Sequence, residues 1–108
     1  MNRTKKLLAL GLLWGAAWSV LAQGTYPNRA VRLLVGFAAG GPTDQVARVV
    51  ATELSEKFKQ QFIVDNRPGG NGAIAAQAVI GSTPDGHTLL VGTSGALTVS
   101  PSILKSMP

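Results

Sequence analysis

The feature that most constrains this chain is an apolar run that leads through a glycine-rich loop into a helix. Residues 31–35 (VRLLV) are almost continuously apolar, which is typical of a strand buried on both faces. A loop of small residues follows, and Pro42 and Asp44 suit the first turn of a helix. This order places unpaired backbone N–H groups at the head of the helix, where anions bind well. The sequence therefore predicts a seat for an anion at this loop.

The segment after the loop predicts an amphipathic helix over residues 43–59. Asp44 lies in its first turn and Lys57 and Lys59 in its last, which matches the helix dipole. Polar residues occupy the other face, so the apolar stripe is expected to face the sheet. The stripe consists of Val46, Ala47, Val49, Val50, Leu54 and Phe58.

Two further strands and a second helix complete the pattern. Residues 62–64 are predicted as a short buried strand, residues 88–91 as a third strand, and residues 73–80 as a short helix with Gly81 at C′. Ser100 before Pro101 is a plausible N-cap for a last helical turn. The order β-α-β-α-β with short connections predicts an α/β fold with a parallel sheet and right-handed crossovers.

Glycine-bearing loops follow all three predicted strands. The carboxyl ends of parallel strands meet at one edge, where open α/β folds bind ligands. The loops offer backbone N–H groups and hydroxyls without a lysine or a reactive nucleophile, which favours holding a small acid over transforming it. The competing interpretation is that glycine and proline only form turns, and that Thr and Ser bond their own backbone. The predicted ligand-binding residues are Gly40, Gly41, Pro42, Thr43, Asp44, Thr93 and Ser94, with Asn71 and Gly72 as weaker candidates.

Enzymatic and metal-binding functions are disfavoured, and no cofactor, catalytic residue or metal ligand is expected. Neither a dinucleotide-binding fingerprint nor a Walker A loop is present. Arg67 either reaches an anion or anchors its own loop by pairing with a backbone carbonyl or an acid. His87 is the only histidine and has no accompanying ligand cluster. A catalytic triad with Ser94 and Asp44 is disfavoured because His87 precedes the third strand, at the opposite end from Ser94.

Residues 1–22 have the pattern of a cleavable signal peptide. Arg3, Lys5 and Lys6 precede an apolar stretch at residues 7–21, and cleavage is expected after Ala22. Without this segment the basic excess becomes small, so binding to nucleic acid is not expected. The chain has no cysteine to form a disulfide or to carry a lipid anchor. Together these features predict a soluble periplasmic protein.

The mature chain resembles the N-terminal part of the substrate-binding proteins of tripartite tricarboxylate transporters, the Bug-type receptors. The match runs from Tyr26-Pro27 to the end of the chain. Lys59 departs from the family pattern, in which glycine is usual at that position. The blocks that carry the match are residues 35–37 with 40–44 (GGPTD), 64–69 (VDNRPG), 83–90 (TPDGHTLL) and 92–95 (GTSG).

The resemblance implies a periplasmic binding protein of type 2, in which two α/β lobes close on a small organic acid. The acid would be a di- or tricarboxylate, an aromatic acid or an acidic amino acid, and the receptor would deliver it to a membrane permease. Gly40, Gly41, Thr43 and Asp44 would hold one carboxylate, with Thr93 and Ser94 lining the same cleft.

Receptors of this kind are much longer, so residues 23–108 are expected to be a truncated first lobe with the second lobe absent. The alternatives are a non-functional remnant of such a receptor and an exported enzyme that binds a phosphorylated substrate. A remnant would keep the fold without the function. An enzyme for phosphorylated substrates would require a cation in the loops.

Overall fold

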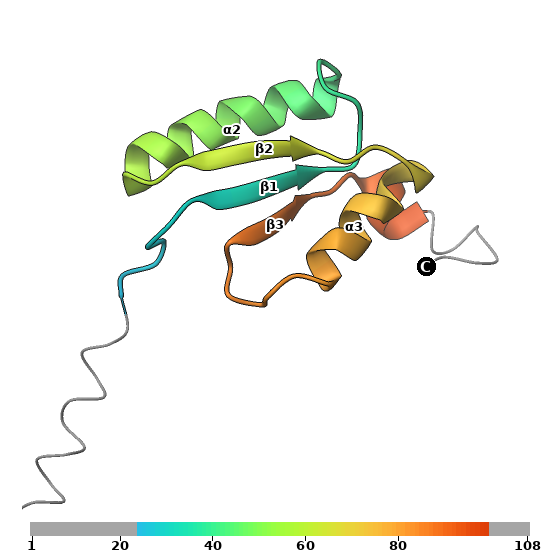
Figure 1. Cartoon of the computed structure of the whole chain (residues 1–108). Coiled ribbons are helices and arrows are strands. Elements are labelled where there is room, and N and C mark those ends of the chain that lie inside the picture. Colours follow the sequence, from blue (N-terminus) through green and yellow to red (C-terminus); the bar gives the residue numbers. More distant parts are fainter. Residues whose placement is uncertain (1–23, 100–108) are drawn as a thin grey trace, which may run out of the picture.

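The structure, a computed structural model, describes residues 24–99. The expected signal peptide at residues 1–22 and the expected helical turn at Ser100 lie outside this range. Strands β1 (Val31–Val35), β2 (Phe62–Asn66) and β3 (Thr88–Val91) form a parallel sheet in the order β2-β1-β3 (Figure 1). This confirms the predicted α/β fold and its parallel sheet.

Helices connect the strands and cover the two faces of the sheet. Helix α2 (Pro42–Phe58) joins β1 to β2, and α3 (Ala73–Ile80) lies between β2 and β3. Since β2 and β3 flank β1 on opposite sides, right-handed crossovers place α2 and α3 on opposite faces (Figure 1). A 3-10 turn, η2 (Gly70–Gly72), precedes α3, and a π-helix, η3 (Gly95–Val99), follows β3. No helix within residues 24–99 is both long and apolar enough to cross a bilayer.

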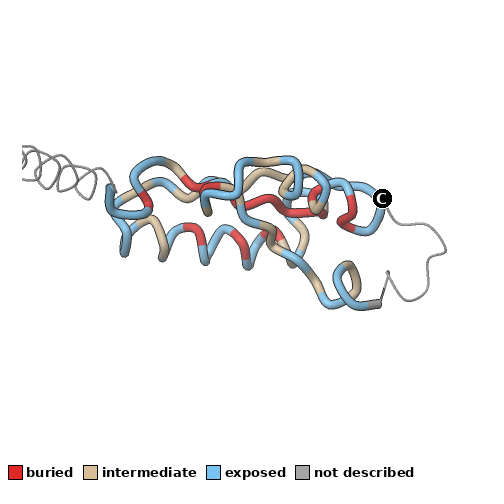
Figure 2. The backbone as a smooth tube through the Cα atoms, turned by 90° about the horizontal axis from the view of Figure 1, so that it is seen from below, coloured by how far each residue is buried: buried red, intermediate tan, exposed pale blue. Residues whose placement is uncertain are grey.

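The core is centred on β1, as the continuous apolar run predicts. Val31, Leu33, Leu34 and Val35 are buried, which shows that both faces of the strand are covered (Figure 2). On the α2 face, Val31 and Leu33 pack with Ala51 of the helix. Burial in this layer is favourable because it removes apolar surface from water.

The predicted apolar stripe of α2 is only partly correct. Ala47 is buried, but the side chains of Val46 and Val49 are 61% and 65% exposed, and Val50 and Phe58 are exposed too. Ala51, which the stripe did not include, is buried instead. Helix α2 packs on two strands of the sheet, which lie along one side of the helix. The small residues Ala47 and Ala51 face these strands, and the bulky residues Val46 and Val49 do not.

Strand β2 is longer and less buried than predicted. It continues to Asn66 because Asp65 and Asn66 still pair with Leu34 and Val35 of β1. Ile63 is 46% exposed, since β2 is an outer strand and α2 covers just one of its faces. The strand is therefore a half-buried edge strand and not a fully buried one.

Both helix ends differ in detail from the prediction. Helix α2 begins one residue earlier, at Pro42, and ends at Phe58 because Lys59 adopts the left-handed conformation (φ 55°). Gly81 ends α3 as predicted, yet it does so with φ −78° and is the C-cap residue. Its N–H donates to the carbonyl of Gln77 at 2.9 Å.

Candidate carboxylate-binding edge

The three glycine-bearing loops leave the sheet at one level. Val35 pairs with Asn66 on one side and with Val91 on the other, so the loops begin at Gly36, Arg67 and Gly92. All three strands run in the same direction, and their carboxyl ends therefore form a single edge. This is the arrangement that the sequence predicted for the ligand-binding edge.

The head of α2 presents two backbone N–H groups at this edge. Gly41 is the N-cap residue and Pro42 occupies the first turn, where it supplies no N–H. The N–H of Gln45 donates to Gly41 O at 3.0 Å, which closes the first helical hydrogen bond. The N–H groups of Thr43 and Asp44 are left among the donors that a helix does not satisfy internally. Thr43 adds a half-buried hydroxyl beside them.

The side chain of Asp44 is turned inward and is already engaged by the protein. The residue is 2% exposed, and its Oδ2 accepts from Gly40 N at 2.9 Å and from Arg48 Nε at 2.8 Å. Its Oδ1 accepts from Asn66 Nδ2 at 2.9 Å. The hydrogen bond from Arg48, then those from Gly40 and Asn66, hold the pKa of Asp44 at about 2, below its ordinary 3.8. Gly40 N is therefore bound internally, and Asp44 offers a ligand its N–H only.

Thr93 and Ser94 lie where β3 passes into η3. Thr93 Oγ1 accepts from Ala96 N at 3.3 Å, as the self-bonding interpretation requires, and its hydroxyl hydrogen stays available for donation. Ser94 is exposed, and its hydroxyl makes no hydrogen bond to residues 24–99. Both hydroxyls belong to the same edge as the head of α2, but no hydrogen bond joins the two loops in the described part of the chain.

The two weaker candidates, Asn71 and Gly72 in the second loop, differ in their exposure to solvent. Asn71 is exposed and has φ 51°, whereas Gly72 is buried and its N–H donates to Gly69 O at 3.1 Å. Arg67 pairs with Asp65 at 3.3 Å, which is the anchoring role considered from the sequence. Arg32 also bonds Asp65 and is the main cause of its lowered pKa.

A small apolar cavity lies where the loops meet, and it is not a ligand site. Gly36, Gly72 and Gly92 all line it, together with side chains of α3 and η3. Its volume of about 20 Å³ is of the order needed for one water molecule. The cavity shows that the inner parts of the three loops pack on one another and leave no room there for a molecule larger than water.

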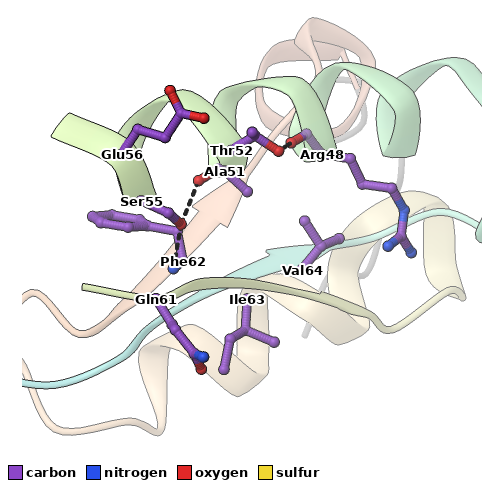
Figure 3. A pocket seen from close by; sticks show the side chains of 9 residues that line it. All are labelled: Arg48, Ala51, Thr52, Ser55, Glu56, Gln61, Phe62, Ile63 and Val64. Carbon is purple, nitrogen blue, oxygen red and sulfur yellow. Dashed lines mark hydrogen bonds between the residues drawn. The ribbon is translucent and has the colours of Figure 1, made fainter. Parts of the chain in front are cut away.

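A larger concave surface is a groove of about 580 Å³ along α2 and β2 (Figure 3). Three of its polar side chains already have internal partners, namely Arg48, Thr52 and Ser55. Thr52 Oγ1 donates to Arg48 O, and Ser55 Oγ donates to Ala51 O at 2.7 Å while accepting from Phe62 N at 2.9 Å. Size alone would select this groove, but its hydrogen bonds hold the helix on the strand and leave no convergent set of donors.

His87 lies at the other end of the sheet, as predicted. It precedes β3, is buried, and packs edge-on against the ring of Tyr26 with 5.0 Å between ring centroids. Its Nδ1 lies 3.2 Å from the carbonyl oxygen of Asp85. This position separates His87 from Ser94 and Asp44, so the three do not form a triad. Within residues 24–99, no cluster of three or more His, Asp or Glu side chains could hold a metal ion.

Sequence reasoning missed one residue of this edge. Asn66 was not among the predicted ligand-binding residues, yet its Nδ2 donates to Phe37 O at 3.1 Å as well as to Asp44. The available signal was its position at the end of a predicted parallel strand, one residue before the loop.

The geometry defines a class of protein. Parallel strands that end in loops of neutral donors, beside a helix N-terminus, are suited to non-covalent binding of an anionic ligand. The chain belongs to the tripartite tricarboxylate transporter receptor family, whose model matches residues 46–108. The Bug-type resemblance seen in the sequence is thereby confirmed.

Individual relatives agree with this assignment. A UPF0065 protein of Bordetella bronchiseptica is 48% identical over 84 residues, covering 78% of this chain and 25% of the relative. Protein BugT of Bordetella pertussis is 38% identical over 111 residues, covering 100% of this chain and 34% of BugT. The chain thus spans about a quarter to a third of these curated relatives.

Solved structures show the same fold. A periplasmic transporter matches with a TM-score of 0.73 and 39% identity, over 78% of this chain and 28% of the other. A Rhodopseudomonas palustris protein with adipate matches with a TM-score of 0.63 and 47% identity, over 65% of this chain and 23% of that protein. MatC of the same organism, with bound malate, matches with a TM-score of 0.57 and 43% identity, over 60% of this chain and 22% of MatC. The predicted likeness to periplasmic binding proteins is confirmed.

Proposed function

We propose that this chain is part of a periplasmic receptor that captures a small carboxylate and delivers it to the membrane permease of a tripartite tricarboxylate transporter. The acid is a di- or tricarboxylate, an aromatic acid or an acidic amino acid. The single observation that carries the proposal is the head of α2, with the N–H groups of Thr43 and Asp44 at the edge shared by Thr93 and Ser94.

The head of α2 supplies the electrostatic part of the binding. The aligned peptide dipoles place partial positive charge at a helix N-terminus, and two N–H groups suit the two oxygens of a carboxylate. Adipate and malate, with which related proteins were solved, are small dicarboxylates. These relatives support a carboxylate as the ligand of this edge.

The hydroxyls supply donors without a fixed charge. Thr43, Thr93 and Ser94 can donate to a carboxylate without forming a buried ion pair, which allows the acid to be released to a permease. Arg67 is the loop cation that an enzyme for phosphorylated substrates would use, but it is paired with Asp65. The donor set therefore favours reversible transport over catalysis.

One lobe is not expected to bind tightly. Micromolar affinity corresponds to about −8 kcal/mol, whereas a helix N-terminus contributes about 0.3–2 kcal/mol to holding a charge. The edge is open to water on the side away from the sheet, and the remaining contacts must come from the part of the receptor that the relatives contain beyond this match. We propose that the 108-residue chain alone binds its acid only weakly.

Export is the second part of the proposal. The signal peptide at residues 1–22 would direct the chain to the periplasm and would be removed after Ala22. Mass spectrometry of the chain recovered from a periplasmic fraction should then show Gln23 as the first residue. Recovery of the intact chain from the cytoplasm alone would contradict this part.

The binding test uses a chimera in which residues 24–99 replace the matching segment of the adipate-bound relative. Isothermal titration with adipate, malate, citrate and glutamate should show micromolar affinity for at least one acid. Thr43→Val should weaken binding at least about tenfold, since a hydrogen bond to a charged group contributes about 1.5–3 kcal/mol.

Thr52→Val is the matched control, because its hydroxyl lies on the same helix and bonds Arg48 O. Binding of no acid by the chimera would overturn the proposal, as would equal losses in the two threonine variants.

A further inference from the structure

We propose that Asn66 is the positioning residue of the carboxylate-binding edge, holding the loop between β1 and α2 in its binding conformation. The inference rests on the proposed function and deepens it. Asn66 would act on the acid only through the loop, by fixing where the N–H groups of Thr43 and Asp44 point.

Asn66 spans the loop from one end to the other. Its Nδ2 donates to Phe37 O at 3.1 Å, at the start of the loop, and to Asp44 Oδ1 at 2.9 Å, in the first turn of α2. A side-chain amide nitrogen carries two hydrogens, and one is used at each end. Strand β2 fixes the position of Asn66 itself, since it pairs with Val35 of the central strand.

Asp44 extends this connection to the middle of the loop. Its Oδ2 accepts from Gly40 N at 2.9 Å and from Arg48 Nε at 2.8 Å, while Oδ1 is the oxygen that Asn66 bonds. The amide of Asn66 therefore holds the loop at Phe37 and at Asp44, and the carboxylate of Asp44 holds it at Gly40. Asp44 is 2% exposed, so its carboxylate is shielded from competing water.

Polar ties matter here because the loop has little apolar anchorage. Ala38, Ala39 and Gly40 are exposed, and a β-carbon placed on Gly40 would meet no atom within 4 Å. Without the two bonds from Asn66, the loop would have to be ordered when the ligand arrives. Ordering a loop on binding lowers affinity, whereas a preorganised loop avoids that cost.

The same geometry argues against direct contact between Asn66 and the acid. Both hydrogens on Nδ2 are directed at protein oxygens, and the remaining amide oxygen is an acceptor that would repel a carboxylate. Asn66 is only half-buried, yet its side chain offers an anion no free donor. Its role is therefore to position the loop.

The first test measures the loop without any ligand. In Asn66→Asp the side chain keeps its shape but loses both donors and faces the Asp44 carboxylate. Amide hydrogen exchange on the full 108-residue chain should then accelerate at Gly40, whose N–H bonds Asp44 Oδ2, with little change at Leu33 in β1. Uniform acceleration at all sites would mean general destabilisation and would overturn the inference, as would unchanged exchange at Gly40.

The second test measures binding in the chimera described above. Asn66→Asp should weaken the affinity for the acid at least about tenfold, the effect of losing roughly 1.4 kcal/mol. Ser55→Ala is the matched control, because it also breaks a hydrogen bond between α2 and β2 but at the far end of the helix. It should lower the melting temperature without changing the affinity.

The outcomes separate this inference from the proposed function. An unmodified chimera that binds no acid overturns the proposed function and, with it, the role of Asn66 in binding. An unmodified chimera that binds, with Asn66→Asp equal to it or Ser55→Ala equally impaired, overturns the inference alone.

Discussion

Gly36 and Gly72 approach so closely that a β-carbon on Gly36 would lie 2.5 Å from the Cα of Gly72. The first residue after β1 is thus packed against the end of η2, two segments far apart in the sequence. A contact of this kind leaves no room for any side chain at position 36. It explains why the loop after the central strand must begin with glycine.

Substitution of Gly36 tests this contact. Gly36→Ala should lower the free energy of unfolding by about 1–3 kcal/mol, because the added methyl group forces backbone to move. Urea unfolding followed by circular dichroism at 222 nm measures the change. Gly81→Ala is the control: at φ −78° alanine is accommodated, and a small stabilisation is expected. Equal behaviour of the two variants would contradict the packing described here.

Ser55 joins α2 to the start of β2 through Phe62 N. Ser55→Ala leaves that N–H without its side-chain acceptor and should cost about 1–3 kcal/mol of unfolding free energy. Thr52→Ala removes a hydroxyl that bonds only the helix carbonyl of Arg48, so its effect should stay within about 0.5 kcal/mol. Chemical denaturation of both variants checks the difference, and a larger loss in Thr52→Ala would refute the assignment.

Lys59 ends α2 in a conformation that favours glycine, with φ 55° and ψ 29°. Lys59→Gly should therefore raise the free energy of unfolding by about 1 kcal/mol, because the left-handed region strains a residue with a β-carbon. Lys57→Gly, two residues earlier and inside the helix, should instead lower it by about 1 kcal/mol. Opposite signs in thermal unfolding are the expected result, and a destabilising Lys59→Gly would be inconsistent with this helix end.

Acid should weaken the fold through Asp44. The pKa of Asp44 is lowered from 3.8 to about 2, chiefly by the hydrogen bond from Arg48, so the folded state favours the ionised form. Its contribution to stability is complete above pH 4 and is lost as the pH falls from about 4 to 2. Asp44→Asn should be less stable at pH 7 and should lose less stability across that interval.

Denaturant unfolding at several pH values measures this difference. Asp65 and Asp85 also have lowered pKa values, caused first by the hydrogen bonds from Arg32 and from His87 N, respectively. Some acid sensitivity should therefore remain in the Asp44→Asn variant. Curves that run parallel for the two proteins would exclude Asp44 as a source of the pH dependence.

Local patterns were sufficient to predict β1, α3 and β3, because each depends on its own run of apolar residues and its own turn signals. The stripe of α2 was partly wrong since the set of residues that packs inward depends on strand order, which leaves Val46 and Val49 exposed. Patterns in one segment carry no information about what the neighbouring strands cover.

The site residues also divide into those that a local pattern predicts and those whose contacts only the folded sheet creates. Thr43, Thr93 and Ser94 were predicted from their place after a strand; the structure puts them at the carboxyl edge of the sheet, and their binding of a ligand stays a prediction. The internal use of Asp44 was not predictable, because its partner Asn66 is distant in the sequence and forms a bond that only the folded sheet creates. Side-chain networks between strands require coordinates, whereas loop positions follow from strand direction.

The central place of β1 gives its loop a different freedom to vary from that of its neighbours. Gly72 restricts that loop from one side and Asn66 from the other, so the loop after β1 is held in a fixed position. The loops after β2 and β3 each border it on one flank, and each carries an exposed residue, Asn71 and Ser94 respectively. Under the proposed function, new ligand preferences would be acquired at these exposed positions of the two outer loops while the contacts to a common acid group stay intact.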